Sequence, residues 1–456
     1  MSRNGVKPKP LLHPEHCKGC GRCIETCAQD CIAAGAEIHP LSGLVPIALS
    51  LERCNACGLC IDACPEPYGL VPDVERPRPT RVPDARDVPA TRVALRGVQP
   101  LIAKGTHAAA VGALLAGCRH FFGYPITPST EGAELMAKLL PVLGGTFMQA
   151  PSEIAAVNMM FGCGASGLPA MTFTSSPGFA LMLEGISYMI GAELPGVFVD
   201  VMRAGPGLGN IGPSQAELKL ACQGLGHGDT HALVLAPATP QEMLDFTMLA
   251  FELSFRDRNP VVILADGYLG QMTGKVALPA FAVRPGRPAW SVAGDAAHRR
   301  NLVASIELRE IDQEAHVRKL AEKYARIGET EQRAELFRCE GAEVVVVACN
   351  TPSQIAKGAV EALRREGIAV GLFRPQTVWP FPVRHLVPLL DRARRIVVVE
   401  ASDGQLENEM RLALSHARVP NGLDIRSVRR LGGMLPSQGE ILEAVRASRP
   451  HPEARA

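Results

Sequence analysis

The sequence predicts an α/β protein with a small cysteine-rich module at its N-terminal end. Short apolar runs alternate with segments of helical pattern, which is typical of buried parallel strands connected by helices. The alternation stops near residue 286 and resumes near residue 340, so two α/β domains are expected. Nine of the fourteen cysteines lie within the first 64 residues, which sets that segment apart.

The N-terminal module, residues 1–70, contains the near-repeat CKGCGRCIETC and CNACGLCIDACP. Both runs have C-x2-C-x2-C-x3-C spacing, in which three thiolates bind one [4Fe–4S] cluster and the fourth binds the neighbouring cluster. The spacing therefore predicts two interlocked clusters. Their ligands are Cys17, Cys20, Cys23 and Cys64 for one cluster, and Cys54, Cys57, Cys60 and Cys27 for the other.

The cysteines of this module allow two alternatives. Zinc sites also use C-x2-C pairs, but they usually take two pairs separated by a longer loop. Cys31 is a ninth cysteine, and shifting the last spacing by one step would give it the role of Cys27. The intact spacing favours Cys27 as the ligand, and Cys31 is expected to be a small buried side chain beneath the cluster.

Residues 71–97 are predicted to be a proline-rich linker. Prolines alternate with charged residues from about residue 65 to residue 100, a pattern typical of an extended tether. Such a tether would keep the clusters at a high local concentration beside the rest of the chain.

Residues 98–285 are predicted to form the larger α/β domain. HAAAVGALLAGC is expected to be a helix, RHFFGYP a short buried strand, and TPSTEGAELMAKLLPVL a helix with a Ser/Thr start signal. SEIAAVNMMFGCGASG is expected to be the next helix. The expected buried parallel strands are AMTFTS, GVFVDVM, ALVLAP and PVVILAD.

Residues 286–339 are predicted to be a helical connector, because IDQEAHVRKLAEKYARIGETEQRAELF is charged like a surface helix or helix pair. Residues 340–456 are predicted to be a second, smaller α/β domain. Its expected elements are AEVVVVACN, PSQIAKGAVEALRREG, IAVGLFRP, VRHLVPLLDRA and RIVVVEAS.

Composition excludes several classes of partner and location. A formal net charge of +1 gives no electrostatic reason to bind nucleic acid or an anionic membrane. The stretch MSRNGVKPKPLLHP lacks the apolar segment of a secretory signal, and the most apolar region is interrupted by Glu184 and Glu193. A cytoplasmic protein is therefore expected, in a reducing compartment that suits thiolate ligands.

Three polar residues in the larger domain are candidate site residues. Thr127 lies at a strand-to-helix turn, where a hydroxyl and free amides can receive a carboxylate, although Ser129 or Thr130 could simply cap the helix. Glu153 begins an almost uncharged helix, a position where an acid usually compensates the helix dipole. Arg203 ends a strand, at the sheet edge where α/β folds bind ligands.

The loop at residues 207–212 matches the G-x-G-x-x-G dinucleotide fingerprint, and Asp229 follows at a suitable distance. Pro206 and Pro213 flank the loop, however, and its first glycine is well past the strand end. A mobile loop over an active site is therefore favoured over a nicotinamide site.

Taken together, these motifs resemble the α subunit of 2-oxoacid:ferredoxin oxidoreductases of the branched-chain 2-oxoacid or 2-oxoglutarate type. The resemblance runs from about residue 98 to 285 and resumes in the C-terminal part. It rests on YPITPSTE, QAPSEIAAVN, TFTSSPGFALMLEGISYMIGAELPGVFVDVMRAGPGLG, SQAE, GHGD, RPQTVWPFP, VVVEASDGQLENEMRLAL and RLGGML.

The resemblance implies a doubly wound domain for the pyrimidine side of thiamine diphosphate and a domain like the C-terminal one of transketolase. The bacterial-type ferredoxin domain predicted by the cysteine spacing is a departure from the simplest α subunit, because many relatives carry it as a separate polypeptide. The resemblance also implies oxidative decarboxylation of a 2-oxoacid to acyl-CoA, with coenzyme A as co-substrate and electrons leaving singly through the clusters. Glu153 would bind the aminopyrimidine ring, while Thr127 and Arg203 would contact the substrate. The residues implied to bind the cofactor are Tyr124, Pro125, Ile126, Thr127 and Glu153.

One part of such an enzyme is missing from the sequence. Diphosphate-side domains carry a G-D-G run followed by paired asparagines that hold Mg²⁺, and the runs at residues 265–267 and 402–404 lack those asparagines. The resemblance thus implies a β subunit that brings Mg²⁺ and the diphosphate half. A γ subunit is also expected, with ferredoxin or an NAD-reducing subunit as electron acceptor.

Two other functions compete with the catalytic one. The chain could be a non-catalytic electron-transfer and docking subunit, or a dehydrogenase that binds NAD through residues 207–212. The presence of Thr127, Glu153 and Arg203 favours a catalytic subunit that is inactive alone.

Overall fold

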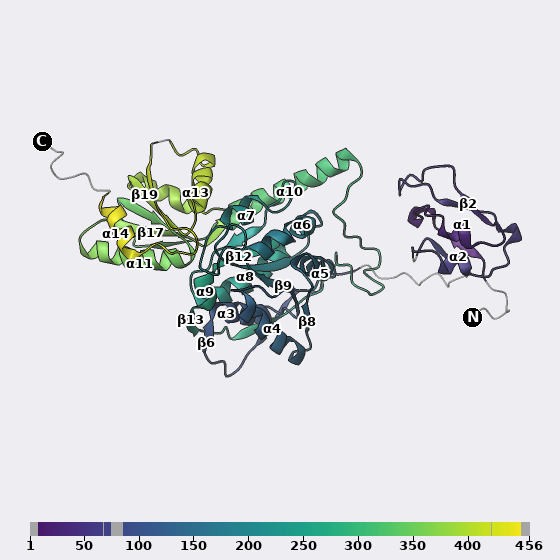
Figure 1. Cartoon of the computed structure of the whole chain (residues 1–456), viewed down its shortest axis with the longest axis horizontal. Coiled ribbons are helices and arrows are strands. Elements are labelled where there is room, and N and C mark those ends of the chain that lie inside the picture. The colour runs from purple at the N-terminus through teal and green to yellow at the C-terminus, as the bar shows by residue number, and fades with distance from the viewer. Residues whose placement is uncertain (1–7, 67, 74–84, 421, 448–456) are drawn as a thin grey trace. The chain divides into compact units, whose positions relative to one another are not determined.

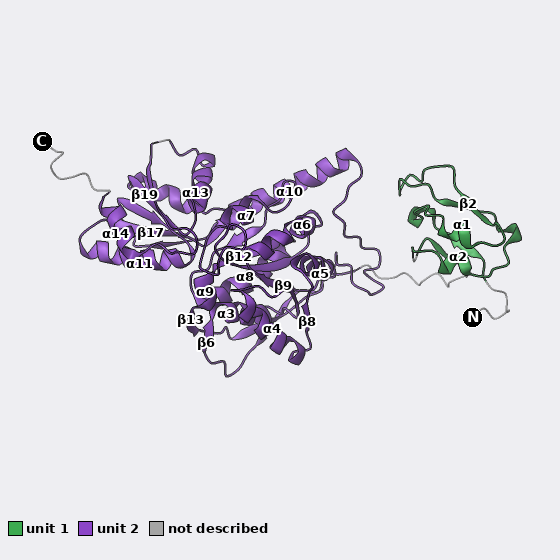
Figure 2. Cartoon of the chain, in the orientation of Figure 1, with its two compact units in different colours: residues 1–83 green, residues 84–456 purple. Residues whose placement is uncertain are grey.

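The computed structural model describes residues 8–66, 68–73, 85–420 and 422–447. The chain divides into two compact units, residues 1–83 and residues 84–456 (Figure 2). Among the described helices, none combines the length and the apolar character needed to cross a membrane.

The first unit consists of two small antiparallel sheets and two short helices. Strand β1 (Pro10–Leu12) pairs with β4 (Leu70–Pro72), and β2 (Ile32–Ala34) pairs with β3 (Ile47–Leu49). Helix α1 (Arg22–Thr26) contacts helix α2 (Leu59–Asp62). The short 3-10 turns η1 (Pro14–His16) and η2 (Leu51–Arg53) each end immediately before the first cysteine of a motif. The repeat in the sequence is therefore a repeat in the structure.

The main part of the second unit is a seven-stranded sheet in the order β18-β11-β12-β10-β9-β7-β8. All neighbouring pairs are parallel except β11 with β18. Every residue of β9, β10 and β12 is buried, which explains their continuous apolar runs and confirms the predicted α/β class. The strands are β7 (His120–Gly123), β8 (Thr146–Gln149), β9 (Ala170–Thr174), β10 (Gly196–Met202), β11 (Leu233–Leu235), β12 (Pro260–Asp266) and β18 (Thr377–Trp379).

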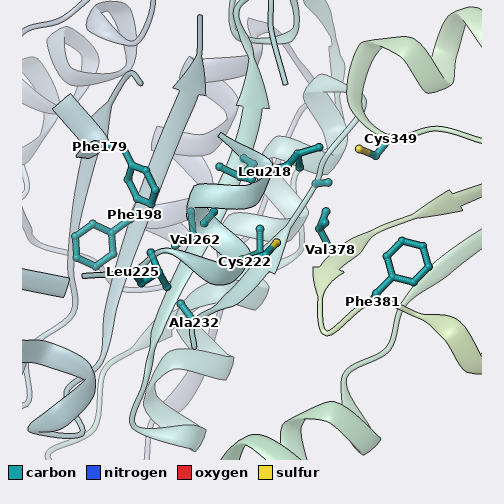
Figure 3. Close-up of a cluster of buried hydrophobic side chains, with 14 of the residues drawn as sticks. Phe179, Phe198, Leu218, Cys222, Leu225, Ala232, Val262, Cys349, Val378 and Phe381 are labelled. Carbon is teal, nitrogen blue, oxygen red and sulfur yellow. The ribbon is translucent and has the colours of Figure 1, made fainter. Parts of the chain in front are cut away.

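Helices cover both faces of this sheet (Figure 1). Alternate residues of β10 belong to two different cores: Val199 packs with residues of α3 and α8, whereas Phe198 packs with residues of α5 and α6. Figure 3 shows the second of these cores continuing from Phe198 to Val378 and Phe381. The helices are α3 (Gly105–Leu115), α4 (Thr130–Val142), α5 (Glu153–Ala165), α6 (Pro177–Gly191), α7 (Leu218–Gln223), α8 (Pro240–Asp257) and α9 (Gly267–Gln271).

The predicted linker, residues 71–97, is wrong at both ends, and its residues 74–84 lie outside the described residues. Strand β4 reaches Pro72, and β5 (Thr91–Ala94) pairs with β14 (Phe281–Arg284). Prolines flank the residues of β5 without interrupting them, so the backbone amides of the strand remain free to pair. The pairing is accompanied by a side-chain contact, in which the Arg92 guanidinium lies 4.3 Å from the centre of the Phe281 ring. A further small pair joins β6 (Leu101–Lys104) to β13 (Thr273–Val276).

The predicted helical connector, residues 286–339, is only partly helical. Helix α10 (Glu310–Thr330) is a single helix, but β15 (Ala334–Phe337) is an edge strand that pairs antiparallel with β17 (Val370–Pro375). This pairing depends on a strand far along the chain, so the charge pattern of the segment could not reveal it.

A second sheet has the order β15-β17-β16-β19-β20, with β16, β17, β19 and β20 parallel. The boundary predicted at residue 340 needs one correction, because β18 leaves this region and completes the seven-stranded sheet. The remaining strands are β16 (Val344–Val347), β17 (Val370–Pro375), β19 (Arg395–Glu400) and β20 (Asp424–Arg429). The helices are α11 (Asn350–Arg365), α12 (Val383–Leu386), η3 (Val387–Asp391), α13 (Gln405–His416) and α14 (Gln438–Arg446).

Candidate functional site

The first unit brings together cysteines from both motifs. Cys17, Cys20 and Cys23 line a small cavity together with Cys64, the last cysteine of the other motif. Burial raises the pKa of Cys23, and the charges of Cys17, Cys64 and Cys20 raise it further, because the four sulfurs lie near one another. This is the first of the two ligand sets expected from the spacing.

The second set likewise combines cysteines from both motifs. Burial raises the pKa of Cys60, and the charges of Cys27 and Cys57 raise it further. Backbone amides also point at the sulfurs: the amides of Gly19 and Ile47 lie 3.5 Å from Cys17 Sγ, and that of Ala56 lies 3.4 Å from Cys54 Sγ. Such N–H···S contacts suit thiolates that bind iron, whose potentials they help to set.

Cys31 is the most buried of the nine cysteines of the unit. It is 3% exposed, and burial raises the pKa of its thiol. Its backbone amide donates to Cys27 Sγ at 3.4 Å, and this contact is the main reason why the pKa of Cys27 is lowered. The amide of Cys31 therefore favours the thiolate of Cys27, while its own side chain belongs to the small core of the unit.

Among the described residues, no three His, Cys, Asp or Glu side chains are grouped as ligands of a single metal ion. A polynuclear cluster binds each of its thiolates through a different iron atom, so its ligands can be further apart. The four-cysteine cavity fits that arrangement.

The second unit carries its candidate residues on the carboxyl edge of the seven-stranded sheet. Thr127 lies in the loop after β7, Glu153 begins α5 after β8, and Arg203 directly follows β10. In parallel strands these ends meet at one edge, where α/β folds bind ligands. The Arg203 guanidinium donates to the Thr127 carbonyl oxygen at 2.9 Å and to that of Leu208 at 3.3 Å, so two of the three residues are in direct contact.

Glu153 is a buried carboxyl group, 4% exposed, at the first position of its helix. The helix cap is supplied by Ser152, whose hydroxyl accepts from the Ala155 amide at 3.3 Å. Gly178 leaves the space that the carboxylate occupies, since a Cβ on Gly178 would lie 2.4 Å from Glu153 Oε1 and 2.4 Å from Thr174 Oγ1. The carboxylate is thus a buried group held beside a second polar atom.

One of the two possible capping residues near Thr127, Ser129, has another role. Ser129 is the first residue before α4, but its hydroxyl donates to the Ile126 carbonyl oxygen at 2.7 Å and caps no amide. Tyr124, Pro125 and Thr127 are exposed, so the loop presents its surface outward. The exposed Thr127 hydroxyl and Tyr124 ring are free to contact a ligand.

Three polar residues at the same edge were not singled out from the sequence. Ser176 follows β9, Asp200 lies on β10, and Glu217 precedes α7. Asp200 is fully buried, and its Oδ1 accepts from the Ser176 amide at 2.8 Å. The signal that could have found it is a single acid within the apolar run GVFVDVM.

The glycine-rich loop at residues 207–212 does not have the strand-turn-helix form of a dinucleotide site. Arg203 forms an isolated antiparallel bridge with Pro213, so the chain folds back on itself, and α7 begins only at Leu218. The loop is held by Asn210, which accepts from the Gly212 amide at 2.7 Å and donates to the Gly432 carbonyl at 3.0 Å.

The aspartates in the Asp-Gly runs at residues 265–267 and 402–404 are held by hydrogen bonds or an ion pair within the chain. Asp266 accepts from the amides of Tyr268, Leu269 and Thr351 at 3.0, 2.9 and 2.9 Å, and from the Thr351 hydroxyl at 2.8 Å. Asp403 pairs with Arg429 at 3.1 Å. The oxygens of Asp266 are fully used in joining α9 to α11.

Apolar side chains surround the open side of the site. Gly267 lies close to Ile211, Pro128 and Met202, because a Cβ on it would be 3.2 to 3.5 Å from their atoms. Tyr124, Leu208, Ile211 and Tyr268 are 41, 84, 62 and 53% exposed, respectively. Exposed apolar groups gathered around a polar site indicate an interaction surface.

Three family models match the chain. Residues 111–334 match "Pyruvate flavodoxin/ferredoxin oxidoreductase, thiamine diP-bdg", and residues 342–441 match "Pyruvate:ferredoxin oxidoreductase core domain II". Residues 16–67 match a "4Fe-4S dicluster domain". The three matches follow one another in the order expected from the sequence.

Curated relatives are similar over most of their length. A ketoisovalerate oxidoreductase subunit VorB of Methanothermobacter thermautotrophicus is 47% identical, over 75% of this chain and 96% of that protein. A 2-oxoglutarate synthase subunit KorA of Methanocaldococcus jannaschii is 35% identical, over 75% of this chain and 98% of that protein.

A solved structure is similar in fold and sequence. It is the 2-oxoglutarate:ferredoxin oxidoreductase from Magnetococcus marinus with 2-oxoglutarate, coenzyme A and succinyl-CoA bound. It has a TM-score of 0.68 and 25% identity, covering 76% of this chain and 65% of that chain.

Proposed function

The chain belongs to the 2-oxoacid:ferredoxin oxidoreductase family, and from this premise we propose how its residues divide the work of that enzyme. The reaction is the oxidative decarboxylation of a 2-oxoacid to an acyl-CoA. The carrying observation is the group formed by Thr127, Glu153 and Arg203 at one sheet edge, within the segment that matches the thiamine diphosphate-binding family model.

Glu153 is the residue that holds the aminopyrimidine of thiamine diphosphate. Its carboxylate is buried, and the absence of a side chain at Gly178 leaves room for it, so the carboxylate is held in place as a hydrogen-bond partner for a ring nitrogen. The loop formed by Tyr124, Pro125, Ile126 and Thr127 lies beside it at the sheet edge. Thiamine diphosphate, when bound, supplies the carbon centre at which the 2-oxoacid loses CO2.

Arg203 binds the carboxylate of the 2-oxoacid, and Thr127 assists it. The guanidinium is already oriented by two carbonyl oxygens, so little rotamer entropy is lost when the substrate binds. A planar guanidinium suits a carboxylate better than a point charge does.

The clusters receive the electrons. Cys17, Cys20, Cys23 and Cys64 are proposed as ligands of one [4Fe–4S] cluster, and Cys54, Cys57, Cys60 and Cys27 as ligands of the other. The cavity lined by the first four and the mutual influence of Cys60, Cys57 and Cys27 support this division. The electron acceptor is ferredoxin or an NAD-reducing subunit.

A β subunit completes the site. The relatives are named as subunits, and this chain lacks a run that could bind Mg²⁺ and diphosphate. The exposed apolar residues Tyr124, Leu208, Ile211 and Tyr268 form the surface that the β subunit covers. A γ subunit is expected in the same complex.

The substrate is a branched-chain 2-oxoacid such as ketoisovalerate. Two relatives named ketoisovalerate oxidoreductase subunits are 47 and 46% identical to this chain, whereas the relatives named 2-oxoglutarate synthase subunits are 34 to 37% identical. Comparing ketoisovalerate with 2-oxoglutarate as substrates of the purified complex tests this choice.

Changing Glu153 to Gln in the complex tests the catalytic reading. Since Gln keeps the shape but cannot act on a proton, turnover of the 2-oxoacid should fall by about 10²- to 10⁴-fold while iron content stays the same. The exposed residue Glu134 on α4 gives the matched control, and E134Q should leave turnover unchanged. Unchanged turnover in E153Q would instead favour a non-catalytic electron-transfer and docking subunit.

A further inference from the structure

Several buried polar atoms near the ends of β9 and β10 and the start of α7 have no hydrogen-bond partner in the described part of the chain. They are Thr174 Oγ1, Ser175 Oγ, Asp200 Oδ2, Glu217 Oε2 and Arg203 Nε. Thr174, Ser175 and Asp200 have no exposed surface, and Glu217 is 9% exposed. Buried polar atoms are nearly always paired, so this concentration in one place calls for bound water or a shared proton.

These groups come from three elements that meet at the carboxyl edge of the sheet. Thr174 ends β9 and lies opposite Asp200 in the register of β10, so their side chains project to the same face. That face carries the core shared with α5 and α6, to which Phe198 and Met202 belong. Glu217 reaches the group from the residue before α7.

Ser176 connects this group to Arg203. Its amide donates to Asp200 Oδ1 at 2.8 Å. Its hydroxyl accepts from the Arg203 amide at 2.9 Å and lies 3.2 Å from the Arg203 carbonyl oxygen, to which it can donate. A change at Asp200 is therefore passed to the backbone of Arg203 through a single residue.

The two acids are poorly suited to being charged together. Burial raises the pKa of Asp200 well above its usual value, and the charge of Glu217 raises it further. Burial also raises the pKa of Glu217 to about 7, against the opposing effects of Ser176 and Arg203. Two interacting acids in an apolar surrounding release their protons in separate steps.

Among the residues that the structure describes, few other charged groups face the pair. Arg203 directly follows the strand that carries Asp200, and Glu153 approaches from α5 beside Thr174. On the next strand, Asp266 is bound by Thr351 and by two amides, so its oxygens are occupied.

We propose that Asp200 and Glu217 form a buried acid pair that shares a proton and, through Ser176, positions Arg203 for the carboxylate of the 2-oxoacid. The inference rests on the proposed function of Arg203. When the pair loses this proton, a further negative charge appears beside the guanidinium and competes with the substrate carboxylate. The Michaelis constant for the 2-oxoacid then rises with pH, while kcat changes less.

The experiment uses the full-length chain purified with its partner subunits. The Michaelis constant is measured between pH 6 and pH 8 for the wild type and for E217Q, and infrared spectra in H2O and D2O identify protonated carboxyl groups. The wild type should show a several-fold rise of the constant across pH 7 and a protonated carboxyl band at neutral pH. E217Q should flatten the rise and weaken the band.

Two further variants separate positioning from general damage. S176A keeps both acids, so the band should remain while the Michaelis constant increases at all pH values. E409Q changes another buried acid of raised pKa, on α13, and should leave the pH profile of the Michaelis constant as in the wild type. D200N replaces E217Q if the latter complex does not assemble.

An unchanged infrared band and an unchanged pH profile in E217Q and D200N would overturn the acid pair. Failure of the proposed function looks different, because no 2-oxoacid would then be turned over by the wild type. Even without turnover, the infrared band of the wild type and its loss in E217Q would show whether the pair carries a proton.

Discussion

Glu153, Asp200 and Cys31 are all buried, but each has a different neighbouring group that accounts for its buried position. Glu153 sits beside the space left by Gly178, and Asp200 accepts from the Ser176 amide. Cys31 offers its amide to the Cys27 sulfur and places its own sulfur in the core. The role of each side chain therefore depends on these neighbours as well as on its residue type.

At the residue scale, the contrast between Cys27 and Cys31 predicts the outcome of serine substitutions. C27S should lose about half of the bound iron, because one cluster is left with three thiolates. C31S should keep both clusters, since its amide contact to Cys27 is unchanged. Iron and sulfide counts of the purified variants measure this, and full iron in C27S with reduced iron in C31S would assign the ligand to Cys31.

At the scale of elements, the site depends on how closely the first turns of α5 and α6 approach. Gly178 lies in the first turn of α6 and faces the carboxylate that begins α5. Any side chain at this position would meet Glu153 and Thr174 at 2.4 Å. The two helix starts therefore set the position of the carboxylate together.

G178A should displace the Glu153 carboxylate and lower kcat/KM by about 10²-fold, because small misplacements of catalytic groups are costly. The matched control is G162A in the interior of α5, where a Cβ meets nothing within 4 Å. That change should leave turnover intact and raise the free energy of unfolding by about 0.5–1 kcal/mol. Equal turnover in the two variants would contradict this account; thermal unfolding checks that both remain folded.

At the scale of the whole second unit, the two sheets are joined by one exchanged strand and by buried charges. Strand β18 leaves the five-stranded sheet region and pairs with β11 of the larger sheet. Arg374 on β17 is 2% exposed, with Nε donating to Glu335 at 2.6 Å and its terminal nitrogens pairing with Glu242 on α8. These links explain why residues 84–456 form one compact unit.

R374M should lower the free energy of unfolding by about 1.5–3 kcal/mol, because it removes charged hydrogen bonds to two partly buried carboxylates, although Glu335 keeps Lys357 and Glu242 keeps the Ala238 amide as partners. Urea unfolding of the full chain measures the change. R318M removes an exposed ion pair to Glu314 on α10 and should cost about 1 kcal/mol or less. A loss of similar size in both variants would show that burial does not strengthen the Arg374 pairs.

The sequence by itself determined the α/β class, most of the strands and helices, and the family. It also placed Thr127, Glu153 and Arg203 as candidates, because each stands at the end of an apolar run or at a helix start, where local pattern is informative. The two cysteine motifs were equally local, since three ligands of each cluster lie within seven residues.

Only the tertiary structure decided which distant residues meet. The pairing of β5 with β14, of β15 with β17 and of β11 with β18 joins segments whose own patterns predict a linker, a helix and a separate domain. The acid pair of Asp200 and Glu217 likewise joins a strand to a loop through Ser176. Local periodicity records which face of an element is buried, but the partner on that face is set by packing and by long-range hydrogen bonds, which no short stretch of sequence contains.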